Sequence, residues 1–157
     1  MTDQADSPHG AERAGDDALK HGSCLCGAVT FTVSCAMKPP DACHCRQCRK
    51  FSGHFFVSTD VPRQAIDIRG GEHIRWYRSS EKVRRGFCGV CGCSLFFDPQ
   101  ASDWIGVAMD AFDGPSGTST ELHIFVAEKG DYYEIGDGLP QYPGIPGHQP
   151  RHAGSSV

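Results

Sequence analysis

The sequence predicts an all-β domain built from small antiparallel sheets. The chain of 157 residues contains 19 glycines and 10 prolines, a composition that favours turns and strands over long helices. Its apolar residues gather in short runs, several of which alternate with polar residues, and turn-forming segments separate them. Short strands at such intervals, with turns between them, are typical of antiparallel all-β domains.

Eight segments are predicted as strands. Residues 29–33 (VTFTV) alternate with period two, and residues 66–69 (IDIR) alternate up to the turn signal Gly70-Gly71. Residues 55–58 are aromatic and β-branched, as strands prefer. The other predicted strands cover residues 74–77, 83–87, 94–97, 104–109 and 122–126.

The rest of the chain offers little regular structure. One short helical turn is predicted at residues 46–51, and residues 132–135 fit either a last short strand or an irregular segment. Residues 1–20 are acidic and nearly free of large apolar side chains, which predicts a disordered tail. Residues 146–157 are predicted to be a second disordered tail, which leaves residues 21–145 as the folded domain.

Composition excludes several classes of function. The formal net charge is −4 and no basic stripe is present, which disfavours nucleic-acid binding because that binding depends on neutralising phosphates. No apolar run approaches the roughly 18 residues that span a membrane. The N-terminal segment lacks the apolar stretch of a secretory signal, so the sequence predicts a cytoplasmic protein; it indicates no oligomeric state.

Nine cysteines are the main functional signal. In a reducing compartment, closely spaced cysteines bind metal more often than they form disulfides, and an odd number cannot pair completely. Seven of them follow the spacings C-x-C, C-x-C-x-x-C and C-x-x-C, which favour zinc. The alternatives are buried apolar cysteines, a redox dithiol, and an iron–sulfur centre, whose usual spacing is absent.

Four cysteines predict a closed structural zinc site. A C-x-C pair and a distant C-x-x-C pair together supply the four thiolates of a tetrahedral site, and glycines beside both pairs favour the sharp turns that this needs. We call these residues the first cysteine group: Cys24, Cys26, Cys88 and Cys91. Two cysteines lie outside the three spacings: Cys93 is expected to pack beside this group, and Cys35 is expected to be a free, partly buried thiol.

The second cysteine group consists of Cys43, Cys45 and Cys48. Three protein ligands with an exchangeable fourth position are the pattern of a catalytic zinc, so these residues are the candidate catalytic site. Closure by a fourth protein ligand is the alternative. Its candidates are Cys93, His54 and His44, of which His44 is expected to point away because it lies between two ligands.

Basic and aromatic residues are candidates for the walls of the second site. Arg46, Arg49 and Lys50 lie beside the cysteines in the sequence, where they could offset the charge of three thiolates or bind an anionic substrate. Each of them also fits an ordinary solvated surface charge. The aromatic candidates, which fit the core better than a pocket wall, are Phe55, Trp76 and Trp104.

Four segments of the sequence, in order, resemble a known family. They read GSCLCGAVTFTV, CHCRQCRKFSG, FCGVCGCSLFF and HIFVAEKGDYYEIGDGLPQ. Their cysteine spacing and the terminal DGLPQ resemble the glutathione-dependent formaldehyde-activating enzyme family, also called the CENP-V/GFA domain family, over roughly residues 21–142. The resemblance implies an Mss4-like β-tent, in which small antiparallel sheets are organised around zinc.

The resemblance also implies a function. It assigns a structural zinc to the first cysteine group and a catalytic zinc to the second, hence two zinc ions per chain. The implied activity is that of S-(hydroxymethyl)glutathione synthase, a carbon–sulfur lyase in the reverse direction. Cys93 departs from the family, whose members usually carry Thr, Ser or a similar small residue at this position.

The function hypothesis follows from this chemistry. A thiol that binds zinc loses its proton near neutral pH, and the thiolate is the form that attacks an aldehyde. We therefore expect a zinc-dependent, carbon–sulfur lyase-like enzyme that adds a thiol such as glutathione to formaldehyde or a similar aldehyde. The alternative is a zinc-binding module or glutathione carrier without turnover.

Overall fold

The structure is a computed structural model that describes residues 19–147, which form ten strands and one α-helix. The first of two sheets has three antiparallel strands in the order β1-β2-β5. Their bounds are Lys20–Ser23 for β1, Thr30–Val33 for β2 and Ile66–Arg69 for β5. The predicted tails lie outside the described residues, apart from their inner ends, where Lys20 already pairs with Val33.

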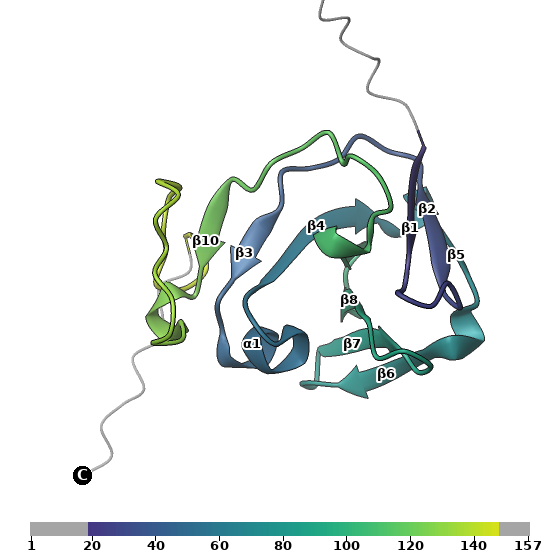
Figure 1. Ribbon diagram of the computed structural model, residues 1–157, viewed down its shortest axis with the longest axis horizontal. Coiled ribbons are helices and arrows are strands. Elements are labelled where there is room, and N and C mark those ends of the chain that lie inside the picture. The colour runs from purple at the N-terminus through teal and green to yellow at the C-terminus, as the bar shows by residue number, and fades with distance from the viewer. Residues whose placement is uncertain (1–18, 148–157) are drawn as a thin grey trace, which may run out of the picture.

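The second sheet has seven strands in the order β10-β3-β4-β9-β8-β7-β6. Figure 1 shows it curving from β10 on one side of the molecule toward the small sheet on the other. The bounds are Leu122–Ile124 (β10), Asp41–Cys43 (β3), Phe56–Pro62 (β4), Trp104–Ala108 (β9), Ser94–Pro99 (β8), Val83–Cys88 (β7) and Ile74–Arg78 (β6). The α-helix, α1, spans Arg46–Ser52, and 3-10 turns span Arg63–Ala65 (η1), Gly71–His73 (η2), Met109–Ala111 (η3) and Val126–Glu128 (η4).

The predicted all-β class with small antiparallel sheets is confirmed. One pair differs, because β10 runs parallel to β3 and joins it only after nearly eighty intervening residues. The strand predicted at 122–126 ends at Ile124, since Phe125 takes a left-handed backbone with φ of 58° and η4 follows. Residues 132–135 form no strand.

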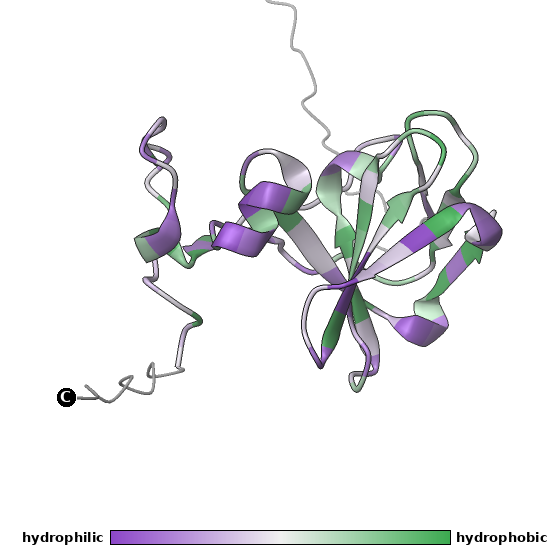
Figure 2. Cartoon of the chain, turned by 90° about the horizontal axis from the view of Figure 1, so that it is seen from below, coloured by the Kyte–Doolittle hydropathy of each residue, from purple (hydrophilic) through white to green (hydrophobic). Residues whose placement is uncertain are grey.

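The core lies between the two sheets. Phe31 of β2 packs edge-on against Phe96 of β8, with ring centroids 5.8 Å apart, and Phe112 meets Phe31 at 5.3 Å. Hydrophobic residues concentrate on the strands, while α1 carries several hydrophilic residues (Figure 2). Within residues 19–147, no helix is long and apolar enough to cross a bilayer.

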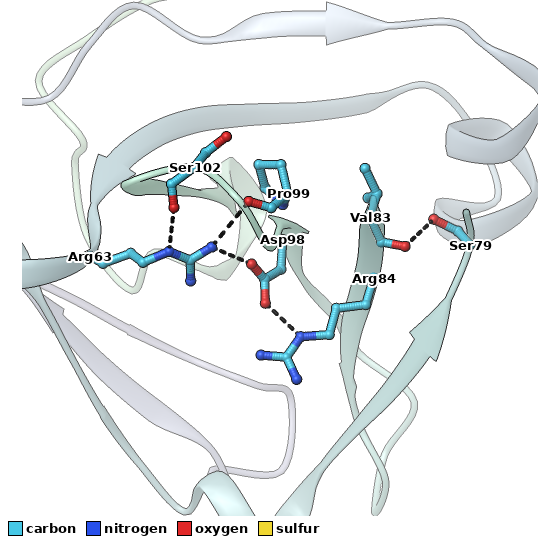
Figure 3. A network of polar contacts seen from close by, with 7 residues as sticks. All are labelled: Arg63, Ser79, Val83, Arg84, Asp98, Pro99 and Ser102. Atoms are coloured by element: carbon cyan, nitrogen blue, oxygen red, sulfur yellow. Dashed lines mark hydrogen bonds and ion pairs between the residues drawn. The ribbon is translucent and has the colours of Figure 1, made fainter. Parts of the chain in front are cut away.

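A buried ion-pair network joins β7 and β8 to η1 (Figure 3). Asp98, with 1% of its side chain exposed, accepts hydrogen bonds from Arg63 and from Arg84, whose Nε is 2.6 Å away. Burial acts to raise the pKa of Asp98, but the hydrogen bonds from Arg63 and Arg84 outweigh it and lower that pKa. The charged carboxylate therefore stabilises the folded chain.

Replacing Asp98 with Asn is expected to lower the free energy of unfolding by about 2 kcal/mol at pH 7, because two charge-assisted hydrogen bonds are weakened. The pKa of Asp98 in the folded state lies below its unfolded value of about 3.9. The stabilisation from its charged carboxylate is therefore complete at pH values above about 3.9, and it is lost as the pH falls through the folded-state pKa. Urea unfolding at pH 7 and pH 3 tests this. A difference between wild type and Asp98→Asn that stays constant across that pH range would contradict it.

Candidate functional site

The first cysteine group converges as predicted. All four sulfur atoms lie within 4.8 Å of one another, with Cys24 and Cys26 3.6 Å apart and Cys26 and Cys88 3.8 Å apart. A tetrahedron with Zn–S bonds of about 2.3 Å places its sulfurs about 3.8 Å apart, so this group fits a four-coordinate metal ion. It joins the turn after β1 to the turn after β7, and so links the two sheets.

Tight backbone turns aim the sulfurs of the first group inward. Gly27 and Gly92 follow the two cysteine pairs with φ of 74° and 78°, a conformation that glycine adopts without strain. The backbone N–H of Val29 donates to Cys24 Sγ at 3.3 Å, and that of Val90 donates to Cys88 Sγ at 3.4 Å. These donors favour thiolates, the form in which cysteine binds metal.

The two remaining cysteines lie outside both groups. Cys93 is near the first group, as predicted, and its Sγ donates weakly toward the carbonyl oxygen of Ser94 at 3.8 Å. Burial raises the pKa of the Cys93 thiol. Cys35 is a partly buried free thiol that packs against the core, also as predicted.

The second cysteine group forms where β3 leads into α1. Cys43 ends the strand, Cys45 is the N-cap of the helix, and Cys48 is its buried third residue. Their sulfurs lie within 4.8 Å of one another, and Cys45 Sγ accepts the backbone N–H of Cys48 at 3.4 Å. Hydrogen bonds with Cys43 and Cys48 lower the pKa of Cys45 to about 2, while the bond to Cys45 raises the pKa of Cys43.

No fourth protein ligand joins the second group among residues 19–147. His44 is fully buried and points away, with Nδ1 2.5 Å from the Tyr133 hydroxyl and Nε2 2.8 Å from Nδ1 of His123. Burial, and then the charge of His123, lowers the pKa of His44 to about 4. His54 contacts the Tyr132 hydroxyl at 3.0 Å instead. Three cysteines with an accessible fourth side fit a metal ion that can take an external ligand.

A cavity of about 660 Å³ adjoins the second cysteine group, and its walls include all three of these cysteines. Of the three aromatic candidates, only Trp104 lines it, whereas Phe55 packs on His44 and Trp76 packs on Phe96. The apolar wall is formed mainly by Phe56, Phe97, Trp104, Ile124 and Phe125, and the charged residues lining the cavity are Asp41, Arg46, Asp60, Arg85 and Glu128.

Arg85 is a functional candidate that the sequence analysis missed. It lies on β7 with 3% of its surface exposed, and its Nη1 donates to Cys48 Sγ at 3.6 Å. Its guanidinium carbon also lies 5.2 Å from the Phe97 ring centroid and 5.5 Å from that of Phe51. Three thiolates around a divalent metal carry a net charge of −1, which this buried cation can offset. The available signal was an arginine on the apolar face of a strand, between Val83 and Phe87.

A protein family described as "Glutathione-dependent formaldehyde-activating enzyme" matches residues 19–128 of this chain, a segment that includes both cysteine groups. This chain belongs to that family. A Halomonas elongata protein, provisionally named as such an enzyme, is 30% identical over 127 residues, which are 74% of this chain and 81% of that protein. An uncharacterized lyase of Schizosaccharomyces pombe is 24% identical over 115 residues, covering 73% and 83% of the two chains.

A solved structure of a Rhodobacter sphaeroides protein has the same fold. Its TM-score is 0.52 at 22% identity, and the match covers 60% of this chain and 89% of that one. The likeness concerns the fold alone, an arrangement of mostly antiparallel strands.

The three basic residues predicted for substrate contact differ from one another in whether they line the cavity. Arg46 is exposed and lines the cavity, whereas Arg49 and Lys50 are not among the residues lining it. Lys50 is exposed, and Arg49 is partly buried, with its Nε shielded from solvent. The structure therefore brings one of the three predicted bases to the cavity and adds Arg85 to it.

Two carboxylates, Asp41 and Asp60, also line the cavity. Asp41 of β3 and Asp60 of β4 also line an adjoining hollow of about 310 Å³, together with Glu121. Burial, followed by the charges of Asp60 and Glu121, raises the pKa of Asp41 to about 6. Within residues 19–147, neither Asp41 nor Asp60 forms an ion pair, so the cavity presents both positive and negative groups to a ligand.

Proposed function

We propose that this family member is a zinc-dependent, carbon–sulfur lyase-like enzyme that adds a small thiol, such as glutathione, to formaldehyde or a similar aldehyde. The observation that carries the proposal is the second cysteine group, whose three sulfurs converge without a fourth protein ligand beside a cavity of about 660 Å³. The family assignment and the lyase name of a relative agree with it.

The proposal gives the two cysteine groups different roles. The first group holds a structural zinc ion and the second holds a catalytic one, which makes two ions per chain. Zinc held by three thiolates favours the thiolate form of a substrate thiol and can polarise an aldehyde carbonyl. Cysteines that stay reduced suit a cytoplasmic location, which we include in the proposal.

The cavity supplies groups that would bind and orient the substrates. Arg46 and Arg85 can meet a carboxylate, and Asp41 and Asp60 can meet an ammonium group. Glutathione carries both kinds of charge. The apolar wall around Phe97 and Trp104 would keep bulk water from the reacting carbon. In the reaction a carbon–sulfur bond forms, and the proton released by the thiol ends on the former carbonyl oxygen.

The test is the rate at which formaldehyde and its thiol adduct interconvert, measured by exchange NMR with 13C-formaldehyde and glutathione. We expect this rate to rise in proportion to the wild-type protein concentration, and the Cys45→Ser variant to match the enzyme-free control. That control is essential, because the thiol and aldehyde also react spontaneously.

Two results would contradict the enzyme proposal. Thiol binding by the wild-type protein without any acceleration over the control would make the protein a thiol carrier. Absence of binding with glutathione and with smaller thiols would make the second group another structural site, which suits a protein-interaction module.

A further inference from the structure

A segment near the end of the described chain packs against the loop that carries the second cysteine group. Residues 122–142, which we call the C-terminal clamp, comprise β10, η4 and the segment that follows them. Figure 1 shows β10 beside β3, with the later residues passing along the outer side of β10. The clamp contacts the cysteine loop, residues 43–48, through its backbone and through its side chains.

Two of these contacts fix the loop backbone. The backbone N–H of His44 donates to the carbonyl of Ile124 at 2.9 Å, which continues the parallel pairing of β3 with β10. The backbone N–H of Arg46, at the start of α1, donates to the Glu128 carboxylate at 2.9 Å. A carboxylate at the N-terminal end of a helix accepts from an otherwise free N–H group, and its negative charge interacts favourably with the positive end of the helix dipole.

The third contact is a buried chain of hydrogen bonds that starts at His44. Its links are Tyr133 hydroxyl to His44 Nδ1 at 2.5 Å, His44 Nε2 to His123 Nδ1 at 2.8 Å, and His123 Nε2 to Asp137 Oδ2 at 2.8 Å. His44 is 0% exposed and His123 is 4% exposed, so water does not compete for these nitrogens.

The carboxylate at one end sets the direction of the link to His123. Asp137 can only accept, so Nε2 of His123 carries a hydrogen; in the tautomer with its single hydrogen there, Nδ1 of His123 accepts. Nε2 of His44 must then donate, and its Nδ1 accepts the Tyr133 hydroxyl. In this arrangement each imidazole has one nitrogen donating and one accepting. The chain satisfies every ring nitrogen.

The far end of the chain is itself anchored. Asp137 Oδ1 accepts the backbone N–H of Leu139 at 3.1 Å. His123 donates its backbone N–H to Pro140 at 2.8 Å and accepts that of Tyr142 at 2.9 Å. Lys129 Nζ donates to the Tyr133 carbonyl at 2.9 Å. The residues that hold His44 are therefore fixed by other contacts within the clamp, and they cannot simply move with the His44 side chain.

We propose that Tyr133, His123 and Asp137 are positioning residues for the second metal site. Holding His44 in place fixes the backbone between Cys43 and Cys45, so that the three sulfurs converge before a metal ion arrives. None of the three residues belongs to the ligand group itself. The inference rests on the proposed function only in requiring that the second group binds a metal ion.

Physical chemistry gives the expected size of the effect. A ligand set that is ordered in advance loses less conformational freedom on binding, and this loss opposes affinity. Removing hydrogen-bonded partners from outside a ligand set lowers metal affinity about 10- to 100-fold. Within residues 19–147, no hydrogen bond joins the first cysteine group to the clamp, so this group serves as a control within the same molecule.

The experiment is a Co²⁺ titration of the full chain against a competing chelator, which follows the thiolate charge-transfer and visible d–d bands of each site. We expect His123→Phe and Tyr133→Phe to weaken second-site Co²⁺ binding about 10-fold or more and to alter its d–d bands. Affinity at the first site should stay unchanged. Asp137→Asn should remain near wild type, because its amide oxygen still accepts from His123.

The matched control is Tyr132→Phe, which removes the neighbouring hydroxyl that contacts His54 and should change neither site. Tyr133→Phe deletes one hydroxyl only, so it keeps the test available if His123→Phe does not fold. Wild-type affinity and spectra in Tyr133→Phe would overturn the clamp proposal, and so would an equal loss at both sites.

The outcomes also separate the clamp from the proposed enzyme function. If wild type binds a single Co²⁺ ion per chain, both ideas fail. If wild type binds two ions but does not accelerate the thiol–aldehyde reaction, the enzyme proposal fails. In that case the second-site affinities of the variants still decide whether the clamp positions the cysteines.

Discussion

Replacing Cys88 with Ser is expected to unfold the domain at ordinary temperatures, whereas Cys45→Ser leaves it folded. Cys88 is fully buried at the end of β7, and its group joins the two sheets. Structural zinc sites in small domains contribute about 10–16 kcal/mol of apparent binding free energy. Whole domains have a net stability of only about 5–15 kcal/mol, so losing one ligand of the first group removes most of that stability.

Cys45→Ser is the corresponding substitution in the second group, chosen because it should preserve the cap of α1. Cys45 Sγ caps α1 by accepting the Cys48 N–H, and a serine hydroxyl accepts equally well at an N-cap. The variant therefore loses a metal ligand and keeps the helix. Cys35→Ser, which alters a cysteine outside both groups, is the control for the chemical change itself.

Thermal unfolding followed by circular dichroism, together with metal analysis, checks this prediction. Wild type and Cys35→Ser should each contain about two metal ions, as two separate thiolate groups imply. Cys45→Ser should contain close to one ion and unfold near the wild-type temperature. An equal loss of unfolding temperature in Cys88→Ser and Cys45→Ser would refute the division into a structural and a catalytic site.

Arg85→Met is expected to lower metal affinity at the second site about 10- to 100-fold, because the charge-assisted contact to Cys48 is worth about 1.5–3 kcal/mol. Removing one partner of a buried ion pair is costly when the other stays charged. Without a metal ion the raised pKa of Cys48 lets its thiol stay protonated, so Arg85→Met leaves no unpaired buried charge there. The fold should therefore survive, and the loss should be specific to the second site.

Two further arginine and lysine variants sharpen this test. Arg46→Met removes an exposed cation from the same cavity, so it should weaken binding of an anionic thiol more than binding of the metal ion. Lys50→Met removes an exposed cation that does not line the cavity, so it should change neither quantity. Chelator competition and thiol titration measure both affinities. Unchanged second-site metal affinity in Arg85→Met would show that Arg85 does not stabilise the thiolates.

Local patterns in the sequence were sufficient to predict both cysteine groups and most strands. The cysteines of each pair are one or two residues apart, so a single turn brings them together, and the alternation of residues 66–69 matches β5. The helix predicted at 46–51 was found as α1, because Cys45 and Gly53 provide its two caps. Each of these features depends on neighbours in the sequence, apart from the meeting of the two distant pairs of the first cysteine group, which needs the folded sheets.

Other features depend on partners that are distant in the sequence. β1 has the sequence KHGS, which carries no apolar alternation, and it is a strand because it pairs with β2. β3 has only three residues and is held between β4 and β10, the latter in parallel. Sequence patterning cannot indicate such pairings, since the energy that stabilises them comes from the partner strand.

The environment of the second cysteine group was decided in the same way. The sequence alone established three closely spaced thiols, flanking bases, and His44 as a residue that should point away from the metal. Only the tertiary structure brought Arg85 to Cys48, and Tyr133 and His123 to His44. The physical reason is that chain spacing determines which sulfurs can share a metal ion, whereas the charges and hydrogen bonds around them come from strands that meet only when the sheet closes.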